Sequence, residues 1–415
     1  MTADNVSRYV VPQRWVHYDP PAVFHRLVEA KTGGGVLNQM PYLPQWIEEA
    51  HAEQLRLEAA GTSRIEGAEF TQREQDEALA ATLTATTRLT RSQRQLRAAD
   101  ATYRWLRSRP AEQPVSADFI REIQRRIVTG CDDDHCEPGR TRPDAWNVTF
   151  GTPRCRGAEG GRECSEAFEG LAAAIAGEFQ RHDRLIQAIA AHYHIGAMHP
   201  FGDGNGRTAR ALEAFMLRRA GVNDVIMVSL SNYYYEHKDE YLTALYETRE
   251  NGHDLTPFLK FALPAVAERC NVVAEAIATN HRRVLFREFA RSLFGKLRSP
   301  RRRVLAQRQL QILEILLDVG PSTGYELGQR IGGLYKDLKH PRRAATRDLI
   351  GLLEMSAVAI EDKHISPNLD WPRESSESEL LDRYENLPSA VTASHPAMAQ
   401  LSQLFGRRGM RKRYS

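Results

Sequence analysis

The sequence HPFGDGNGRTAR occupies residues 199–210 and lies between two amphipathic segments. In the preceding segment, residues 184–198, apolar side chains recur at helical spacing, and residues 211–220 repeat that pattern. Gly204 and Gly206 permit positive φ angles and a close approach of the backbone to a ligand. The pattern therefore predicts a helix, a tight polar turn and a second helix that begins at about Asn205 or Gly206.

The predicted turn has the chemistry of an anion site, because a helix N-terminus offers unpaired N–H groups and a positive dipole end. Arg207 and Arg210 are three residues apart and share one helix face, where their guanidinium groups suit phosphate. Asp203 is a carboxylate that Mg²⁺ could use, and His199 titrates near neutrality, which suits a general base. Together these groups predict phosphoryl or nucleotidyl transfer; the alternative is a structural corner with solvated arginines.

The same residues resemble the signature of the Fic family, H-x-F-x-[DE]-G-N-G-R-x-x-R, at every fixed position. The resemblance implies transfer of AMP from ATP, with Mg²⁺, to a Ser, Thr or Tyr hydroxyl of a target protein. It implies that His199 is the catalytic base and that Asp203 is the metal ligand. The Gly206-Arg207 pair favours AMP transfer over the chemistry of Doc-type kinases. The residues implied in binding the nucleotide are Phe201, Gly204, Asn205, Gly206, Arg207 and Arg210.

A second motif, TSRIEG at residues 62–67, resembles the inhibitory motif [ST]-x-x-x-E-[GN] that precedes some Fic domains. A carboxylate paired with Arg210 would remove the charge that holds the γ-phosphate of ATP. Glu66 is therefore the expected inhibitory residue. In some family members this Glu positions water to remove AMP from a modified protein, and the sequence leaves that reaction open.

Composition sets the class of protein. The chain has 415 residues, 42% of them hydrophobic and 26% charged, with a net charge of +3, which is typical of a globular protein of two or three domains. It has no N-terminal apolar leader and no apolar run of about 18 residues. We therefore expect a cytoplasmic protein that does not enter the membrane.

Four of the five cysteines cluster with a histidine, at Cys131, His135, Cys136, Cys155 and Cys164. These residue types could bind zinc, but their spacings match no common zinc motif. Reduced thiols are the preferred interpretation.

Residues 139–153 interrupt the helical pattern with alternating apolar residues, which predicts a short strand. In position this segment is similar to the Fic flap, a β-hairpin that holds the target by strand addition. The expected flap residues are Trp146, Asn147, Val148 and Thr149.

The C-terminal third becomes rich in Lys and Arg from residue 281 onward. The patterns of residues 310–319, 324–331 and 341–354, followed by an apolar run at 357–360, resemble a winged helix-turn-helix. Its third helix would present Arg342, Arg343 and Arg347 to DNA. The alternative is a helical appendage for dimer or target contacts.

The combined prediction is an all-α Fic-type bundle with a small β-hairpin flap and a C-terminal winged helix-turn-helix domain. Its function would be protein adenylyltransfer, with the chain itself as one conceivable target and with homodimers common in the family. A DNA-binding transcriptional regulator whose Fic module senses nucleotide is the alternative, and a different nucleotide donor is another. The expected segments are an N-terminal helical region (1–90), the Fic core (91–285), a basic linker (286–306), the winged helix (307–370) and a flexible tail (371–415).

Overall fold

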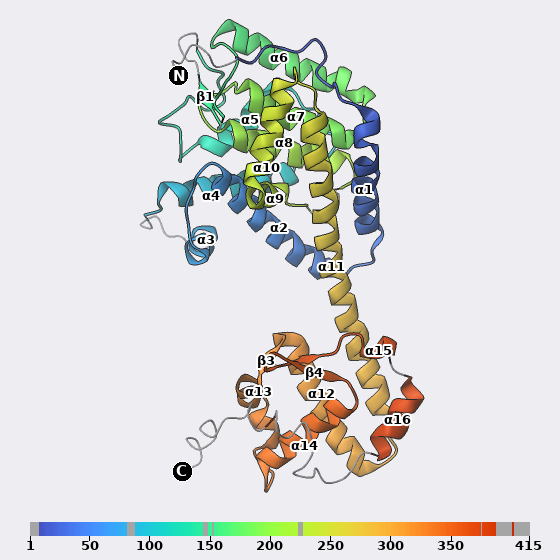
Figure 1. Ribbon diagram of the computed structural model, residues 1–415. Helices are drawn as coiled ribbons and strands as arrows, with labels where there is room; N and C mark the ends of the chain where they lie inside the picture. The colour runs from blue at the N-terminus through green and yellow to red at the C-terminus, as the bar shows by residue number, and fades with distance from the viewer. Residues whose placement is uncertain are drawn as a thin grey trace. The chain divides into compact units, whose positions relative to one another are not determined.

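The computed structural model describes residues 8–80, 88–143, 148–151, 153–222, 227–374, 376–386 and 401. It is built of helices with a few short strands, which confirms the predicted all-α class (Figure 1). Contacts divide the chain into a first unit, Met1–Ile277, and a second unit, Ala278–Ser415. Among the described residues, no helix is long and apolar enough to cross a membrane.

The first unit is a helical bundle with one small hairpin. Its elements are α1 (Pro20–Gln39), α2 (Pro44–Ile65), α3 (Gln72–Leu79), α4 (Arg91–Arg107), α5 (Ala117–Val128), β1 (Thr149–Phe150), β2 (Cys155–Arg156), α6 (Arg162–Ala176), η2 (Glu178–Arg181), α7 (Arg184–Met198), α8 (Asn205–Arg219), α9 (Leu230–Glu236), α10 (Lys238–Glu250) and the first half of α11 (Thr256–Gly295).

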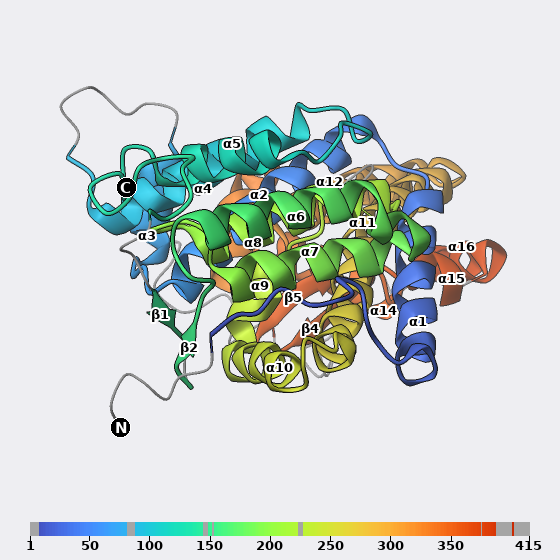
Figure 2. The ribbon, with the colours of Figure 1, turned by 90° about the horizontal axis from the view of Figure 1, so that it is seen from above.

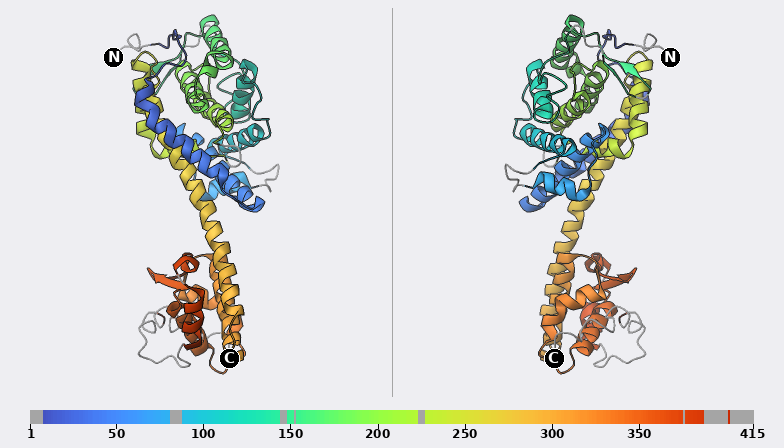
Figure 3. Two further views of the ribbon diagram at one scale, coloured as in Figure 1. Left: turned by 90° about the vertical axis from the view of Figure 1, so that its right-hand side faces the viewer. Right: turned by 90° about the vertical axis from the view of Figure 1, so that its left-hand side faces the viewer.

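Helices α7 and α8 form the centre of this unit and lie side by side in both views (Figures 1 and 2). Nearly every residue of α7 is buried, because the helix is covered on several sides and not only along one stripe. Helix α1 runs beside the first half of α11 (Figure 3), where a Cβ on Gly33 would lie 3.2 Å from the Cys270 side chain. The turn between α7 and α8 is therefore held on a rigid helix pair.

The helix predictions agree with the structure where local signals were strong. The segment 184–198 is helical over its full predicted length, and Ser116 caps α5 by accepting a hydrogen bond from the Phe119 N–H at 3.2 Å. The predicted flap is a short antiparallel hairpin in which Thr149 pairs with Arg156. Trp146 and Asn147 lie outside the described residues, whereas Val148 and Thr149 lie within them.

The second unit has its own apolar core, which includes Leu313, Leu349 and Ile365. Its three short strands form an antiparallel sheet in the order β3-β5-β4. After the end of α11, its elements are α12 (Pro300–Val319), β3 (Ser322–Thr323), α13 (Gly324–Ile331), η3 (Gly332–Tyr335), α14 (Pro341–Glu354), β4 (Val358–Glu361), β5 (His364–Pro367), α15 (Trp371–Glu374) and α16 (Glu377–Asn386).

The structure differs from three of the expected segment boundaries. In the expected region 1–90, residues of the described stretch 8–80, among them Tyr9, Leu55 and Ala78, share one core with the Fic segment and do not form a separate region. Residues 286–306 are mostly helical, because Phe286, Ala290 and Leu293 recur at helical spacing and their side chains lie in the core of the second unit. The expected tail begins with two helices, α15 and α16, whose Trp371 and Tyr384 are buried in the same core.

Candidate functional site

The turn between α7 and α8 is closed by its own side chains and glycines. His199 takes the left-handed conformation at φ 53° and ends α7, and Gly204 at φ 77° precedes α8. The side-chain amide of Asn205 forms two hydrogen bonds with the backbone of Phe201. Its Oδ1 accepts from the Phe201 N–H and its Nδ2 donates to the Phe201 carbonyl oxygen, each at 2.8 Å. A Cβ on Gly204 would lie 2.7 Å from Val128, so the turn can pack on α5 only with glycine there.

His199 is placed as a neutral base. Its Nδ1 lies 3.1 Å from the Gly196 carbonyl oxygen, which accepts a hydrogen bond from Nδ1–H and leaves Nε2 with the free lone pair. Burial lowers the pKa of the imidazole to about 4, despite the opposing effect of this hydrogen bond. The ring also stacks on Phe150 of the flap, with centroids 3.9 Å apart and an interplanar angle of 11°. The imidazole is thus fixed by one edge and one face.

The loop that carries His199 is supported by a buried arginine. Arg142 donates a hydrogen bond from Nε to the His199 carbonyl at 2.8 Å, and its backbone N–H donates to the Pro200 carbonyl at 2.9 Å. The side chain of Arg142 is 1% exposed. Desolvation lowers its pKa, although guanidinium remains charged. The Arg142 guanidinium therefore stabilises the backbone of the turn and is too buried to contact a ligand.

Arg210 and Glu66 form the ion pair that the inhibitory motif predicted. The Arg210 Nη2 lies 2.6 Å from the Glu66 Oε1, across 144 residues of sequence. Arg210 is also held by Thr62, whose Oγ1 accepts from Nε at 2.8 Å and whose carbonyl oxygen accepts from Nη2 at 3.2 Å. Burial raises the pKa of the Glu66 carboxyl, but the charge and hydrogen bond of Arg210 outweigh this effect and leave it below its ordinary value.

Glu66 also lies against the first turn of α8. A Cβ on Gly206 would lie 2.2 Å from the Glu66 Oε1 and 3.2 Å from an Arg210 nitrogen. Only glycine at position 206 therefore admits the carboxylate to the helix N-terminus, where backbone N–H groups attract anions.

Gly206→Ala should lower the free energy of unfolding of the wild-type chain by about 1 kcal/mol, because the new methyl group displaces Glu66 from Arg210. In a Glu66→Gly background the same substitution should be neutral or slightly stabilising, since alanine favours a helix by about 0.5–1 kcal/mol. Denaturant unfolding of the four chains measures this difference. Gly35→Ala in α1 is the matched control, because a Cβ there would meet no atom within 4 Å. Equal costs in both backgrounds would contradict the steric coupling.

Arg207 makes contacts that the sequence did not reveal. Its Nη1 lies 2.6 Å from Asp132 Oδ2 and its Nη2 lies 3.0 Å from Asp203 Oδ1. Asp132 is fully buried and also accepts hydrogen bonds from Arg91 and Gln95. Desolvation raises the pKa of Asp132, but Arg207 and Arg91 lower it by more. The pKa of this carboxyl group therefore lies below its ordinary value. Arg207 therefore orients the Asp203 carboxylate, and no local signal links Asp132 to a residue 75 positions away.

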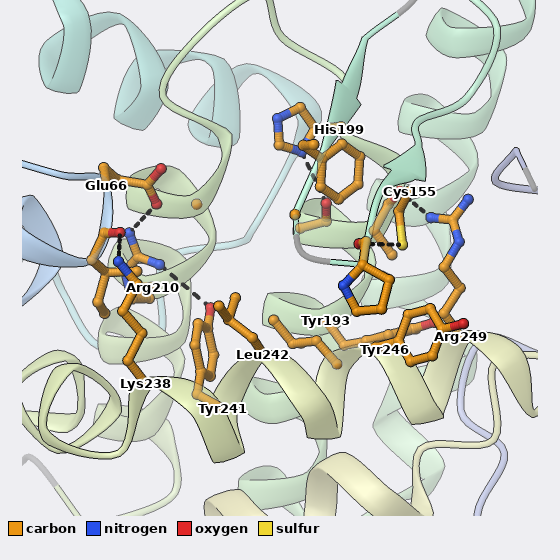
Figure 4. Close-up of a pocket in the computed structure, with 18 residues that line it drawn as sticks. Glu66, Cys155, Tyr193, His199, Arg210, Lys238, Tyr241, Leu242, Tyr246 and Arg249 are labelled. Carbon is orange, nitrogen blue, oxygen red and sulfur yellow. Dashed lines mark hydrogen bonds and ion pairs between the residues drawn. The ribbon is translucent and has the colours of Figure 1, made fainter. Parts of the chain in front are cut away.

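A cavity of about 350 Å³ borders the turn between α7 and α8, and neither Arg207 nor Asp203 is among its lining residues. His199, Gly206, Arg210 and Glu66 line it together with residues of the flap and of α10 (Figure 4). In the close-up, Glu66, Arg210 and Lys238 lie toward one end, and Tyr246 and Arg249 toward the other. The lining residues from α10 are Lys238, Tyr241, Leu242, Leu245, Tyr246 and Arg249. Their helical spacing was visible in the sequence, but nothing there showed that this face borders the turn.

The cysteine cluster does not assemble into a metal site in the described part of the chain. All five cysteines are free and buried. No group of three or more His, Cys, Asp or Glu side chains that could hold a metal ion occurs among the residues that the structure covers. Cys155 borders the cavity at β2, and burial raises the pKa of its thiol.

Parts of this chain are similar to known proteins. Residues 114–217 match the Fic/DOC family, which confirms the predicted Fic domain for that segment. The protein adenylyltransferase fic-1 of Caenorhabditis elegans is 31% identical over 148 residues, which are 35% of this chain and 26% of that protein. The protein adenylyltransferase Fic of Aedes aegypti is 39% identical over 74 residues, 18% of this chain and 13% of that protein. The chain thus spans about a quarter or less of the length of these relatives.

Solved structures show the same fold. Residues 134–508 of Fic-1 from C. elegans superpose with a TM-score of 0.52 at 21% identity, covering 63% of this chain and 74% of that one. A Fic family protein from Desulfovibrio desulfuricans superposes with a TM-score of 0.51 at 18% identity, covering 87% of this chain and 98% of that one. The helical Fic fold is thereby confirmed.

Proposed function

We propose that this chain is a protein adenylyltransferase that moves AMP from Mg²⁺-ATP to a Ser, Thr or Tyr hydroxyl of a target protein. The observation that carries the proposal is the shared cavity, where the neutral His199 faces the same space as Arg210 and the N-terminus of α8. The hydroxyl oxygen would form a bond to the α-phosphorus as the bond from that phosphorus to the bridging oxygen breaks. Pyrophosphate leaves with that oxygen, and the hydroxyl proton passes to His199 Nε2.

The turn would bind the phosphates through backbone groups. Gly204, Asn205 and Gly206 present the N-terminus of α8, and Arg210 adds a permanent charge beside it. Phe201 is fully buried, so its role would be to support the turn from below. We propose that Arg207 acts mainly through Asp203, given its two carboxylate partners.

Asp203 fits the role of a magnesium ligand. Its side chain is 31% exposed, and Arg207 and the Gly204 N–H hold its Oδ1. Mg²⁺ needs only one or two protein carboxylates when phosphate oxygens and water complete its shell. A bound Mg²⁺ would neutralise charge on the phosphates, and Asp203 is the residue that would hold it.

Glu66 is the proposed inhibitor of this reaction. It occupies the place beside Gly206 and Arg210 where the terminal phosphate of ATP would lie. Lys238 supports this arrangement, because its Nζ donates to the Ile65 carbonyl at 2.9 Å and so holds the end of α2. ATP bound without the Arg210 contact would be displaced from in-line geometry, and small displacements are costly in transfer reactions.

The flap would hold the target segment. β2 is flanked by β1 on one side and by Arg8, which pairs with Arg156, on the other. Strand addition is therefore proposed for the remaining edge, which belongs to β1 and includes Thr149 with Val148 before it. A target hydroxyl placed there would lie near Phe150 and the His199 ring on which it stacks.

The test is incorporation of label from α-labelled ATP, with Mg²⁺, into protein. Three chains are compared: wild type, Glu66→Gly, and Glu66→Gly with His199→Ala. Strong labelling by the Glu66→Gly chain alone would support His199 as the base, Glu66 as the inhibitor and ATP as the donor of AMP. If none labels while nucleotide still binds, the regulator that senses nucleotide, or another donor, becomes the better interpretation.

The second unit supports a second candidate function, binding of duplex DNA. Its helices α12, α13 and α14 are followed by the hairpin β4-β5, the order of a winged helix-turn-helix, and we propose α14 as its recognition helix. Arg342 and Arg343 are exposed at the start of α14. Arg347 is a weaker candidate than the sequence suggested, because its guanidinium lies 3.1 Å from the buried Asp348 carboxylate.

Arg342→Ala with Arg343→Ala should weaken binding of the full chain to duplex DNA and make it less dependent on salt. Each lost phosphate contact should lower the slope of log K against log salt by about 0.9. Fluorescence anisotropy with a labelled duplex of mixed sequence measures both effects. Arg287→Ala with Arg291→Ala, on α11, makes the same change in net charge and is the control. Equal losses in both double variants, or no binding at low salt, would contradict DNA recognition by α14.

A further inference from the structure

Arg210 is the end of a chain of buried hydrogen bonds that leads away from Glu66. Its Nη1 lies 3.4 Å from the Tyr241 hydroxyl, which lies 2.9 Å from His192 Nε2. His192 Nδ1 in turn lies 2.9 Å from Glu213 Oε2. We call these four residues, Arg210, Tyr241, His192 and Glu213, the Arg210 relay.

The direction of every bond in the relay follows from its two charged ends. The Glu213 carboxylate can only accept, so His192 carries a proton on Nδ1 and donates it to Glu213. Guanidinium can only donate, so the Tyr241 oxygen accepts from Arg210, and the Tyr241 hydroxyl donates to the remaining lone pair on Nε2 of the neutral imidazole. The side chains of His192 and Glu213 are each 1% exposed. Without competition from water, the relay has one orientation.

The partners of Arg210 in the relay lie on other segments of the chain than its remaining partners, Glu66 and Thr62. Glu66 follows directly on α2, and Thr62 lies on α2, so these partners share one segment. Tyr241 lies on α10, and the relay continues through α7 and α8. The contact at Tyr241 therefore comes from a different helix than the contacts with Thr62 and Glu66 (Figure 4).

We infer that Tyr241, held by His192 and Glu213, positions Arg210 for the terminal phosphates of ATP once Glu66 has left it, an inference that rests on the proposed function. The buried Glu213 carboxylate is the second anion that balances the Arg210 charge, and it acts through two neutral groups. Tyr241 is thus a positioning residue that selects for a nucleotide with phosphates beyond the first. AMP has no such phosphates and would not use the contact.

The test measures the affinities of ATP and AMP, with Mg²⁺, for the full chain that carries Glu66→Gly. Adding Tyr241→Phe should weaken ATP binding about fivefold and leave AMP binding unchanged. The expected factor is smaller than the loss of a short hydrogen bond to a charged group would give, because the distance from Arg210 to the Tyr241 hydroxyl is 3.4 Å. In transfer assays the KM for ATP should rise by a similar factor while kcat changes less. Isothermal titration calorimetry gives the two affinities. Glu213→Gln, which keeps the shape but removes the charge, should change the ATP-to-AMP ratio in the same direction.

Tyr234→Phe is the matched control. Its ring stacks on that of Tyr241, with centroids 4.9 Å apart, and its hydroxyl donates to Glu213 at 3.0 Å. It should lower the melting temperature about as much as Tyr241→Phe but change the ATP-to-AMP ratio less. Equal weakening of ATP and AMP by Tyr241→Phe, or no change for ATP, would overturn the inference. If the Glu66→Gly chain transfers no AMP, the proposed function fails, and the affinity ratio still tests the relay.

Discussion

Replacing Glu66 with glycine should raise AMP transfer by about 10²-fold, the size of effect that correct alignment of a reacting group produces. The substitution removes the carboxylate that lies 2.6 Å from the Arg210 guanidinium and frees the N-terminus of α8 for phosphate. Incorporation of α-labelled AMP into protein measures the change. Without nucleotide the variant should unfold at a lower temperature, because Arg210 remains buried without its direct counterion. Saturating Mg²⁺-ATP should restore part of that stability.

Two controls separate the charge of Glu66 from its shape and position. Glu66→Gln keeps the length of the side chain but weakens the pairing with Arg210, so its activity should fall between those of wild type and Glu66→Gly. Glu69→Gly places the same substitution at an exposed residue of the same loop and should leave transfer unchanged. Equal activity of wild type and Glu66→Gly would exclude Glu66 as an inhibitor.

Replacing His199 with alanine in the Glu66→Gly chain should lower transfer by about 10²- to 10⁴-fold, the range for loss of a general base. Binding of ATP should change little, because in the proposed function the phosphate groups would meet α8 and Arg210 and not the imidazole. Single-turnover transfer and calorimetry measure the two properties separately. A variant that keeps its activity would show that another group removes the proton.

The pH dependence of transfer should follow the lowered pKa of His199. An ordinary histidine would lose its basic form near pH 6.5, whereas burial keeps His199 neutral down to a pKa of about 4. The rate in the Glu66→Gly chain should therefore stay level from pH about 7.5 to about 5.5. Stability falls over the same range, because His51, His194 and His253, also with lowered pKa values, gain protons only when the chain unfolds. Circular dichroism corrects for the folded fraction, and a rate that halves near pH 6.5 would contradict a base with a lowered pKa.

The sequence predicted the turn well because its chemistry is local. Within residues 199–210, helix periodicity, two glycines and the spacing of the arginines define a helix N-terminus that can bind an anion. The structure has α8 beginning at Asn205, as expected. The match of residues 114–217 to the Fic/DOC family agrees with the Fic domain that these residues predicted.

The structure differs from the expectations at places where charge alone suggested exposure. The arginine-rich residues 286–306 were expected to form a linker, but their apolar residues lie at helical spacing and belong to a core. Arg347 was expected to face a ligand, yet it lies beside Asp348, which is 1% exposed and also pairs with Arg308. A basic run shows the charge of a surface but not which of its members find a carboxylate.

The sequence by itself determined the candidates for the proposed reaction: His199 as base, Asp203 as metal carboxylate, the turn at residues 204–206 for phosphate and Glu66 as inhibitor. The tertiary structure decided which groups meet. It brings Glu66 to Arg210 across 144 residues and Asp132 to Arg207 across 75, and it links Arg210 to Glu213 through Tyr241 and His192. Local spacing encodes a turn because helix geometry fixes neighbours three and four residues apart. Distant pairs depend on how whole helices pack, which no short stretch of the chain specifies.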